Sequence, residues 1–404
     1  IRLLRHHIST KSLIYARFLH DHVIRCGHDS YPVICYLLLQ FYFQCGAFND
    51  VMGLFEFNLP YQDNNTLSWN LVIGSCIWQG EYSNAFRYFD EMQCRGILYD
   101  KITFIQVLSA CTTLEEGSMV YDRICLSALQ FDTIVGTAIV TMFGTNGDVH
   151  NAERAFDGIL IQNVVSWNAL LSVYAQNKEF SKAMALFSRM YQEAMLPDKV
   201  SFVNVFTTLA RGMIYIGNCK KVHACAVYIH ILHDYIVITS LIYMYGRHGL
   251  LKDAKMTFDQ SDERNTATWN AMITVYAQHG YVDDAFNVYA LMQFEGVMPD
   301  KVTFISLLDT CNARTFLFTA RLIHMKILYS NFLFDTILIT SLLNAYGKCD
   351  AVHVARELFD TMISKNIVSW NAMLSGYIEQ GEAKRVVLLY RQMQEEGPDP
   401  NCQT

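Results

Sequence analysis

The hexapeptide Ser166-Trp167-Asn168-Ala169-Leu170-Leu171 governs how the whole chain is organised, because it recurs. Three further copies begin Ser68-Trp69-Asn70, Thr268-Trp269-Asn270 and Ser369-Trp370-Asn371, so that successive tryptophans lie 98, 102 and 101 residues apart. Four of the five tryptophans fall in this register. A long internal period of this kind is the mark of a repeat protein rather than of several unrelated domains.

The composition favours a continuously folded chain. The 404 residues are 52% hydrophobic and 17% charged and include only six prolines, which argues against disorder and long linkers. The formal net charge is −7, whereas a protein that gripped RNA through charge alone would be basic. Twelve cysteines are spread singly without a C-x-x-C pair, as is typical of buried thiols in a reducing compartment. The longest apolar run, Tyr31 to Phe43, is interrupted by Gln40 and is too short to cross a membrane.

Each Trp-Asn stretch opens a predicted helical hairpin. Trp167, Leu170, Leu171 and Tyr174 follow the spacing of one apolar helix face, and a second apolar stripe runs from Ala183 to Met190. Neither helix can bury its stripe alone, so neighbouring hairpins are expected to stack. Because the tryptophans lie on the stripe, we expect them in the core between hairpins rather than against a ligand.

Two further kinds of unit follow each Trp-Asn unit and complete a superrepeat of 35, 35 and 31 residues. Middle units open like Lys199-Val200-Ser201-Phe202-Val203, and third units carry motifs such as Met244-Tyr245-Gly246. The first middle unit lacks three residues near Cys111 to Gly117, which accounts for the shorter tryptophan spacing. The predicted units are 66–100, 101–132, 133–163, 164–198, 199–234, 235–265, 266–300, 301–335, 336–366 and 367–401.

Residues 1–65 look like a worn copy of the same pattern. Arg17 to His20 matches the second helix of a middle unit, and Phe41 to Gly46 matches Met244 to Gly249. The alternative is that the early arginines and histidines belong to a transit peptide. The chain begins at Ile1 rather than methionine, so a targeting peptide is expected to lie upstream.

These units resemble the pentatricopeptide repeat (PPR) proteins, in particular the plant PLS subclass with its P, L and S repeats. The openings V-V-S-W-N, K-V-S-F-V and L-I-Y-M-Y-G carry the resemblance, which covers essentially the whole chain as about eleven repeats. Tetratricopeptide repeats, the nearest competitor, start with W-x-x-L-G-x-x-Y, which is absent. The resemblance implies an all-α, right-handed α-solenoid that binds single-stranded RNA along its concave face, one base per repeat. It also implies a mitochondrial or chloroplast location and site recognition for C-to-U RNA editing.

By the same resemblance, the fifth and last residues of a repeat select the base, and the second residue packs against its face. Asn with Asp favours U, Thr with Asn favours A, and Asn with Asn favours a pyrimidine. The P-type pairs are Asn70/Asp100, Asn168/Asp198, Asn270/Asp300 and Asn371/Asn401, and the S-type pairs are Thr137/Asn163, Thr239/Asn265 and Thr340/Asn366. The second residues are Leu67, Ile134, Val165, Ile236, Ala267, Ile337 and Val368, of which the small Ala267 should hold its base more loosely.

The L repeats are assigned no base. Their pairs are Ile105/Asp132, Val203/Asp234 and Ile305/Asp335, and an aliphatic side chain cannot hydrogen-bond a base edge. In the other repeats the chemistry suits the assignment, because an Asn amide can match a pyrimidine edge and a Thr hydroxyl can donate to an adenine ring nitrogen. Bound with its 5′ end at the protein N-terminus, the predicted RNA reads U-n-A-U-n-A-U-n-A-Y.

A structural alternative exists for these pairs. The asparagine after each tryptophan could be only a helix-start residue, with the Asp or Asn before each unit serving as a helix cap. The presence of both members of the pair in seven repeats of two lengths favours base selection.

No motif for catalysis, a cofactor or a metal is recognisable. A zinc deaminase would need H-x-E followed by P-C-x-x-C, and neither part occurs. Histidine pairs such as His6-His7 and His20/His22 lack a third ligand. We therefore expect a non-enzymatic, cofactor-free protein that recruits a deaminase in trans, or a truncated or decayed copy of one. A protein–protein scaffold, and RNA stabilisation or splicing, are the alternatives, and the local charge of the concave groove would separate RNA binding from a scaffold.

Overall fold

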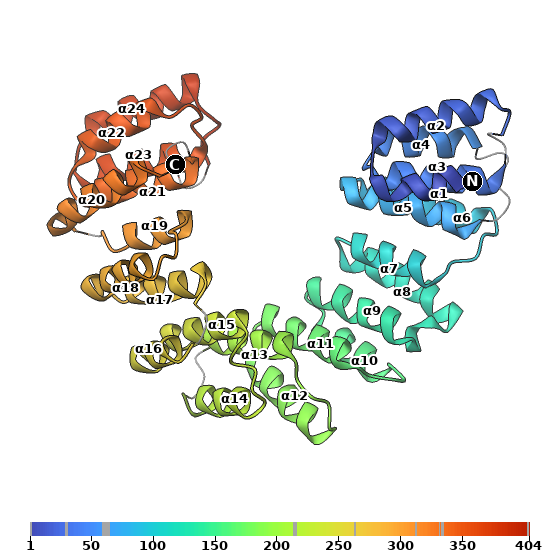
Figure 1. Ribbon diagram of the computed structural model, residues 1–404, viewed down its shortest axis with the longest axis horizontal. Coiled ribbons are helices and arrows are strands. Elements are labelled where there is room, and N and C mark those ends of the chain that lie inside the picture. The colour runs from blue at the N-terminus through green and yellow to red at the C-terminus, as the bar shows by residue number, and fades with distance from the viewer. Residues whose placement is uncertain are drawn as a thin grey trace. The chain divides into compact units, whose positions relative to one another are not determined.

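The structure of the protein is a computed structural model. Within the residues that it describes, every regular element is a helix, as predicted. The chain divides into two compact units, residues 1–204 and 205–404, each built from stacked helical hairpins (Figure 1). The described residues are 2–28, 31–58, 65–212, 216–261, 264–311, 313–330, 332, 335–401 and 404.

In unit 1 each hairpin pairs a first helix with a second helix that follows it directly. The unit opens with α1 (Arg2–His7), the 3-10 turn η1 (Ile8–Thr10) and α2 (Leu13–Arg25). The hairpins that follow are α3 (Pro32–Gln44) with α4 (Phe48–Asn58), α5 (Thr66–Gln79) with α6 (Tyr82–Cys94), α7 (Lys101–Ala110) with α8 (Leu114–Ser127) and η3 (Leu129–Phe131), α9 (Thr133–Thr145) with α10 (Val149–Asp157), and α11 (Val164–Gln176) with α12 (Phe180–Gln192).

Unit 2 repeats the arrangement. The helix α13 (Lys199–Arg211) begins in unit 1 and ends in unit 2, where α14 (Ile216–Tyr228) follows it. The later hairpins are α15 (Tyr235–Arg247) with α16 (Leu251–Asp259), α17 (Thr266–Gln278) with α18 (Val282–Phe294), α19 (Lys301–Leu308) with η4 (Arg314–Phe316) and α20 (Leu317–Leu328), α21 (Thr336–Lys348) with α22 (Val352–Thr361), and α23 (Ile367–Glu379) with α24 (Ala383–Glu396).

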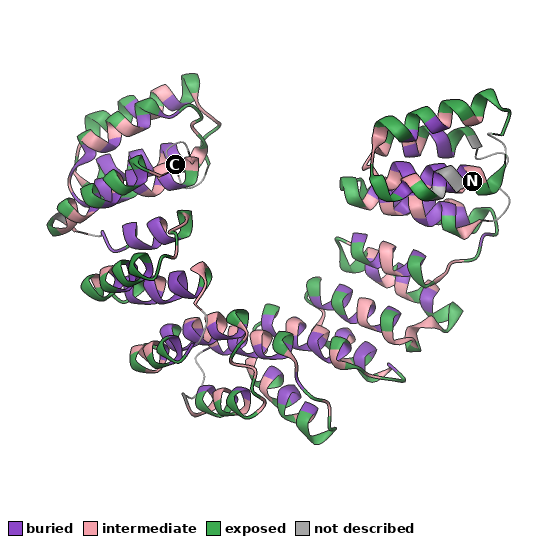
Figure 2. Ribbon diagram, viewed as in Figure 1, coloured by how far each residue is buried: buried purple, intermediate pink, exposed green. Residues whose placement is uncertain are grey.

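First helices pack on first helices. In unit 1 the series α3, α5, α7, α9, α11 is continuous, and in unit 2 the series α15, α17, α19, α21, α23 is continuous. Second helices such as α4, α10, α16 and α22 also contact the first helix of the next hairpin. The second helices carry most of the solvent exposure, as Figure 2 shows for α24, in which only Leu389 and Met393 are buried. The stacked first helices therefore form the shared core layer of each unit.

The tryptophans lie in the core between hairpins, as predicted. Trp69, Trp167, Trp269 and Trp370 are at most 1% exposed. Each indole packs in a T-shaped arrangement against a phenylalanine from the preceding second helix, with ring centroids 4.8–5.1 Å apart. Aromatic pairs prefer this arrangement. The four phenylalanines are Phe55, Phe156, Phe258 and Phe359.

The Tyr-Gly motif of the third units lets two first helices approach closely. A Cβ atom placed on Gly246 of α15 would lie 2.4 Å from Val275 Cγ2 of α17, so only glycine fits. At the same contact His279 Nε2 lies 2.7 Å from the carbonyl oxygen of Gly246. Asn177 Nδ2 donates to the carbonyl of Gly144 in the same way. These bonds satisfy carbonyls in the last turn of a helix, which have no partner within it.

A partly buried histidine–tyrosine pair recurs between the second helix of an L repeat and the first helix of an S repeat. The Nδ1 atoms of His223 and His324 lie 2.7 and 2.9 Å from the hydroxyls of Tyr245 and Tyr346. His20 and Tyr42 form the same pair at 2.8 Å. Residues 1–65 therefore contain the same histidine–tyrosine contact as the later repeats.

These histidines make stability depend on pH. Burial lowers the pKa of both His223 and His324 below the ordinary value of 6.5, although Asp253 acts in the opposite direction on His223. The unfolded chain therefore binds more protons than the folded one below pH 6.5, and stability is lost as the pH falls. Each tenfold weakening of proton affinity corresponds to about 1.4 kcal/mol.

We expect the urea midpoint, followed by circular dichroism, to fall between pH 7.5 and pH 5.5. The double variant His223→Gln/His324→Gln should lose clearly less stability over this range. His353→Gln, at an exposed position of α22, should behave like the unaltered protein. An identical fall in all three proteins would contradict the assignment.

Candidate nucleic-acid interface

The structure brings the two members of each P-type pair together. Asn70 Nδ2 donates a hydrogen bond of 2.9 Å to Asp100 Oδ1. Asn168 and Asp198 form the same bond at 2.9 Å, as do Asn270 and Asp300. In the last P repeat the acceptor is the amide oxygen of Asn401, 3.4 Å from Asn371 Nδ2. Residues thirty positions apart in the sequence thus form one polar group in every P repeat.

A third side chain, which sequence reasoning missed, completes this group. The hydroxyl of Ser201 donates to Asn168 Oδ1 at 2.6 Å, and the hydroxyl of Thr103 donates to Asn70 Oδ1 at 2.7 Å. Thr303 and Thr404 donate to Asn270 and Asn371 at 2.6 and 2.8 Å. We call the asparagine, the Asp or Asn, and this hydroxyl residue a P triad. The available signal in the sequence is a hydroxyl residue three positions after the last residue of each P repeat.

The triad around Asn168 is largely buried and holds an ionised carboxylate. Asn168 is 8% exposed and Ser201 is fully buried. Burial by itself would raise the pKa of Asp198, but hydrogen bonds from the Ser201 backbone N–H, the Asn168 amide and the Ser201 hydroxyl outweigh it, so that the pKa is lowered. The Asp198 carboxylate therefore accepts the amide proton as an anion, which strengthens the bond.

The S-type pairs are arranged differently. The hydroxyls of Thr137, Thr239 and Thr340 each donate to the carbonyl four residues earlier in their own helix, at 2.6–2.7 Å. Asn163, Asn265 and Asn366 accept from the backbone N–H three residues later and cap α11, α17 and α23. Among the residues described, no hydrogen bond joins one of these threonines to its asparagine. Each of these hydroxyl protons is therefore used within its own helix.

The last residues of the P repeats act as helix caps and at the same time bond to the asparagine of their pair. Asp100 and Asp300 accept from the backbone N–H groups of Thr103 and Thr303 and cap α7 and α19. The same Oδ1 atoms also accept from the selector amides. One carboxylate oxygen thus joins the start of a helix to the side chain of the preceding repeat.

The second residues form an exposed apolar series beside the pairs. Their exposure ranges from 39% for Ile236 to 62% for Ile134, although aliphatic side chains normally avoid water. Ala267 is also exposed. Ile102, Val200 and Val302 continue the series in the L repeats, where they too are exposed. Each repeat from 66 onward therefore presents one residue that can pack against the face of a base.

In unit 1 these residues border a groove of about 330 Å³. Val165 and Val200 line it together with Asn168 and Thr137, so predicted selectors and predicted base-packing residues share one cavity. Farther along the same helices the lining residues are Thr141 and Thr145 of α9 and Ser172 and Gln176 of α11. The fifth, ninth and thirteenth residues of a repeat therefore lie on the groove, since they are one turn apart.

The first helices carry little charge, and that charge is mostly positive. Among the described first helices from α3 to α23, the only acidic residue is Glu379, the last residue of α23. The corresponding basic residues are Lys101, Lys199, Arg211, Arg247, Lys301 and Lys348. Most of the acidity behind the net charge of −7 therefore lies on the second helices and in the connections.

The L repeats hold their last residue in a different contact. Lys101, the first residue of its repeat, forms an ion pair with Asp132, the last. Lys301 Nζ and Asp335 Oδ2 are 3.7 Å apart in the equivalent positions. The lysine lowers the pKa of Asp132 through its hydrogen bond. In these two L repeats the last residue is therefore held in an ion pair with the first residue of its own repeat.

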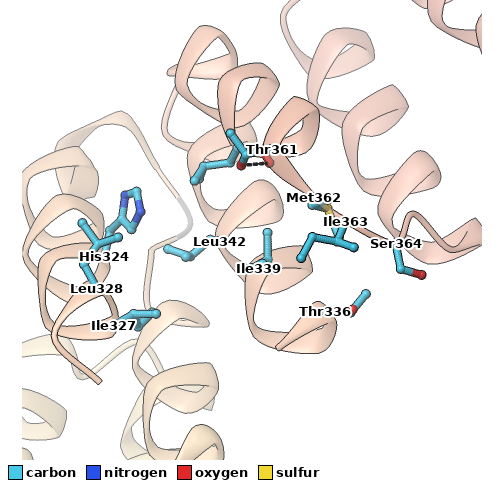
Figure 3. A pocket seen from close by; sticks show the side chains of 11 residues that line it. His324, Ile327, Leu328, Thr336, Ile339, Leu342, Thr361, Met362, Ile363 and Ser364 are labelled. Atoms are coloured by element: carbon cyan, nitrogen blue, oxygen red, sulfur yellow. Dashed lines mark hydrogen bonds between the residues drawn. The ribbon is translucent and has the colours of Figure 1, made fainter. Parts of the chain in front are cut away.

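A larger groove, of about 580 Å³, lies between α20, α21 and α22 (Figure 3). Its lining is mainly aliphatic and includes Ile327, Ile339 and Leu342, with His324 at one side. None of the predicted selectors lines it.

In the part of the chain that the structure describes, no three His, Cys, Asp or Glu side chains are placed to share a metal ion. None of the described helices has the combination of length and hydrophobicity that a membrane span requires.

Several plant proteins are similar to this chain over most of its length. A chloroplastic pentatricopeptide repeat-containing protein of Arabidopsis thaliana is 29% identical over 90% of this chain and 45% of its own length. A second chloroplastic one is 29% identical over 97% of the chain and 48% of its own length. A mitochondrial one is 27% identical over 92% and 48%. The chain spans about half the length of these curated relatives.

Solved structures and family models also match this chain to pentatricopeptide repeat proteins. The crystal structure of the pentatricopeptide repeat protein PPR10 from maize superposes with a TM-score of 0.72 at 18% identity, covering 95% of this chain and 56% of that one. PPR10 in complex with an 18-nt psaJ RNA element gives 0.69, with 94% and 57% covered. The PPR repeat family model matches residues 64–113, 162–211, 264–312 and 365–404, and the PPR repeat model matches 236–265 and 338–367. The chain is a helical-repeat protein of the pentatricopeptide repeat family.

Proposed function

We propose that this chain is a sequence-specific, single-stranded RNA-binding protein of the PLS subclass, in which each P and S repeat reads one base. The observation that carries the proposal is the P triad, which recurs four times, with the asparagine amide 2.9 Å from its acceptor in three repeats and 3.4 Å in the last. A geometry that places one amide at the same point of every third repeat suits a ligand with a regular spacing, such as a nucleic-acid strand.

The neighbouring groove supports a base as the ligand. In unit 1 it is lined by Val165, Val200 and Asn168. A flat ring can lie between two aliphatic side chains while its polar edge meets the amide. Asn70, Asn168 and Asn270 are each paired with an aspartate and are assigned to U, whereas Asn371 with Asn401 is assigned to a pyrimidine.

The charge of the first helices supports RNA over a protein-binding scaffold. Arg247 and Lys348 occupy the thirteenth position of their repeats, the position at which Thr145 lines the groove in unit 1. Arg211 holds the same position in α13. Cations placed along a largely uncharged layer can meet phosphates despite the net charge of −7. A protein–protein scaffold would need no such residues there.

The role proposed for this binding is site recognition in C-to-U RNA editing within an organelle, with a deaminase supplied in trans. The names of the relatives, which are chloroplastic or mitochondrial, support an organelle. RNA stabilisation or splicing would use the same binding surface.

Binding of the purified protein to a short RNA with the sequence U-n-A-U-n-A-U-n-A-Y tests the proposal. The control RNA exchanges every U for A and every A for U, keeps each n unchanged, and is measured at the same salt. We expect the matched RNA to bind at least about a hundredfold more tightly, because one mismatched base typically costs about 1–3 kcal/mol. Equal affinity for both RNAs would reject the base assignment, and binding to neither would favour a scaffold.

A further inference from the structure

We propose that the hydroxyl of the third residue after each P repeat is a positioning group that fixes the orientation of the selector amide and thereby sets the preference for uracil over cytosine. The residues concerned are Thr103, Ser201 and Thr303, which follow the three repeats whose asparagine is paired with an aspartate. This inference rests on the proposed function and assigns a specificity-determining role to residues outside the predicted selector pairs.

The triad around Asn168 is a closed ring of hydrogen bonds. Asn168 Nδ2 donates to Asp198 Oδ1 at 2.9 Å, and Ser201 Oγ lies 2.6 Å from Asn168 Oδ1 and 3.1 Å from Asp198 Oδ1. The backbone N–H of Asp198 also donates to Ser201 Oγ, at 3.1 Å. Since Ser201 is fully buried, water does not compete for these contacts.

The ring admits one orientation of the amide. If the amide turned over, its oxygen would face the Asp198 carboxylate oxygen, and two acceptors cannot share a proton that neither carries. In the last P repeat the carboxylate is replaced by Asn401, whose amide can serve as donor or acceptor. There the hydroxyl of Thr404 lies 2.8 Å from Asn371 Oδ1, but a hydroxyl can accept as well as donate, so without a carboxylate the amide can take either orientation, in keeping with the assignment of this repeat to either pyrimidine.

Orientation matters because uracil and cytosine differ by an exchange of donors and acceptors. Uracil offers a carbonyl at position 4 and an N–H at position 3, whereas cytosine offers an amino group and an unprotonated nitrogen. The outward N–H and oxygen of a fixed amide fit one of these patterns. An amide that is free to turn over fits both patterns, so it would bind uracil and cytosine with similar affinity.

The S repeats supply an internal comparison. Ser166 and Ser369 occupy the same third position after an S repeat, and their hydroxyls donate to the backbone carbonyls of Asn163 and Asn366 at 2.8 Å. Thr268 donates to the Asn265 side chain. Among the described residues, none of these hydroxyls reaches the fifth residue of the preceding repeat. A hydroxyl cap therefore does not require the bond to the selector, which is made where that selector is asparagine.

Two substitutions at one position test the proposal. Ser201→Ala removes the hydroxyl, and Ser201→Thr keeps it in the form that Thr103 and Thr303 already use. Four RNAs that differ only at the nucleotide assigned to repeat 164–198 are measured with each protein. We expect Ser201→Ala to lower the ratio of U to C affinity about three- to tenfold, the effect of one neutral hydrogen bond, and Ser201→Thr to leave it unchanged. Neither variant should alter the preference at the nucleotide assigned to repeat 266–300.

A measurement without RNA separates this inference from the proposed function. In protein labelled with ¹⁵N at asparagine, the side-chain amide protons of Asn168 should exchange with water faster in Ser201→Ala than in Ser201→Thr. Ser201→Cys, which keeps the shape but is a weak donor, replaces the alanine variant if circular dichroism finds the latter unfolded. Equal weakening of all four RNAs, or equal exchange rates, would reduce the hydroxyl to a helix cap and overturn the inference. If the unaltered protein binds none of the RNAs, the proposed function fails, and the exchange rates still decide whether the hydroxyl orients the amide.

Discussion

Replacing Trp269 by alanine is expected to cost about 3–5 kcal/mol of unfolding free energy, the usual effect of removing a large aromatic side chain from a close-packed core. Trp269 is fully buried, meets the edge of Phe258 at 4.8 Å and lies under the guanidinium group of Arg264 at 5.7 Å. The cavity would open where α16 packs on α17, at the contact between two stacked hairpins. Urea unfolding followed by circular dichroism measures the loss.

Trp78→Ala is the matched control for this substitution. Trp78 belongs to α5 but lies outside the repeated Trp-Asn register and is 66% exposed. Its loss should cost less than about 1 kcal/mol, as is usual for exposed positions. Hydrogen exchange should further show that Trp269→Ala opens α16 to α18 before the other hairpins. Comparable losses in the two variants would mean that the repeated tryptophans are not the main inter-hairpin contacts.

The second large effect is expected on RNA binding. Asn168→Ala should weaken binding by about 1–3 kcal/mol when U stands at the nucleotide assigned to repeat 164–198, and much less when another base stands there. The double variant Asn168→Thr/Asp198→Asn converts this P-type pair into an S-type pair. Because Asn caps a helix about as well as Asp, this variant should stay folded and change its preference at that nucleotide from U to A.

Val203→Ala, at the fifth position of the next L repeat, is the control for base selection. An aliphatic residue there makes no hydrogen bond to a base, so its truncation should not change the preference at any nucleotide. Equilibrium binding to four RNAs varied at the one nucleotide gives the result for each protein. A uniform loss for Asn168→Ala, whatever the base, would contradict one-base reading at this repeat and leave RNA binding itself untouched.

The helical hairpins and the tryptophan core could be predicted from the sequence because both depend on short-range spacing. The apolar stripe through Trp167, Leu170 and Leu171 is visible without a structure, since it follows the helical period. Burial of the four tryptophans follows from the same stripe. Repetition over about 101 residues then averages out local irregularities that would mislead the interpretation of a single hairpin.

The polar contacts between repeats could not be predicted in this way. Ser201 has the sequence signature of a helix-start residue, and its backbone N–H donates to the cap Asp198, but the bond of its hydroxyl to Asn168 spans 33 residues and depends on the rotamers of both side chains. Likewise, nothing in the sequence indicates that Thr137 donates its hydroxyl proton to Thr133. A periodic pattern identifies the positions that face a ligand, whereas the direction of each proton depends on neighbours that only the fold supplies.

The P triad also defines where this chain can be cut and rejoined. A module exchanged between solenoids at residue 199, the first residue of a repeat, would leave Asn168 and Asp198 in one parent and Ser201 in the other. A junction placed after Ser201 keeps the whole hydrogen-bonded ring in one parental segment, and junctions after Thr103 and Thr303 do the same for theirs. The segment to exchange between such proteins is therefore the structural repeat shifted by three residues toward the C-terminus.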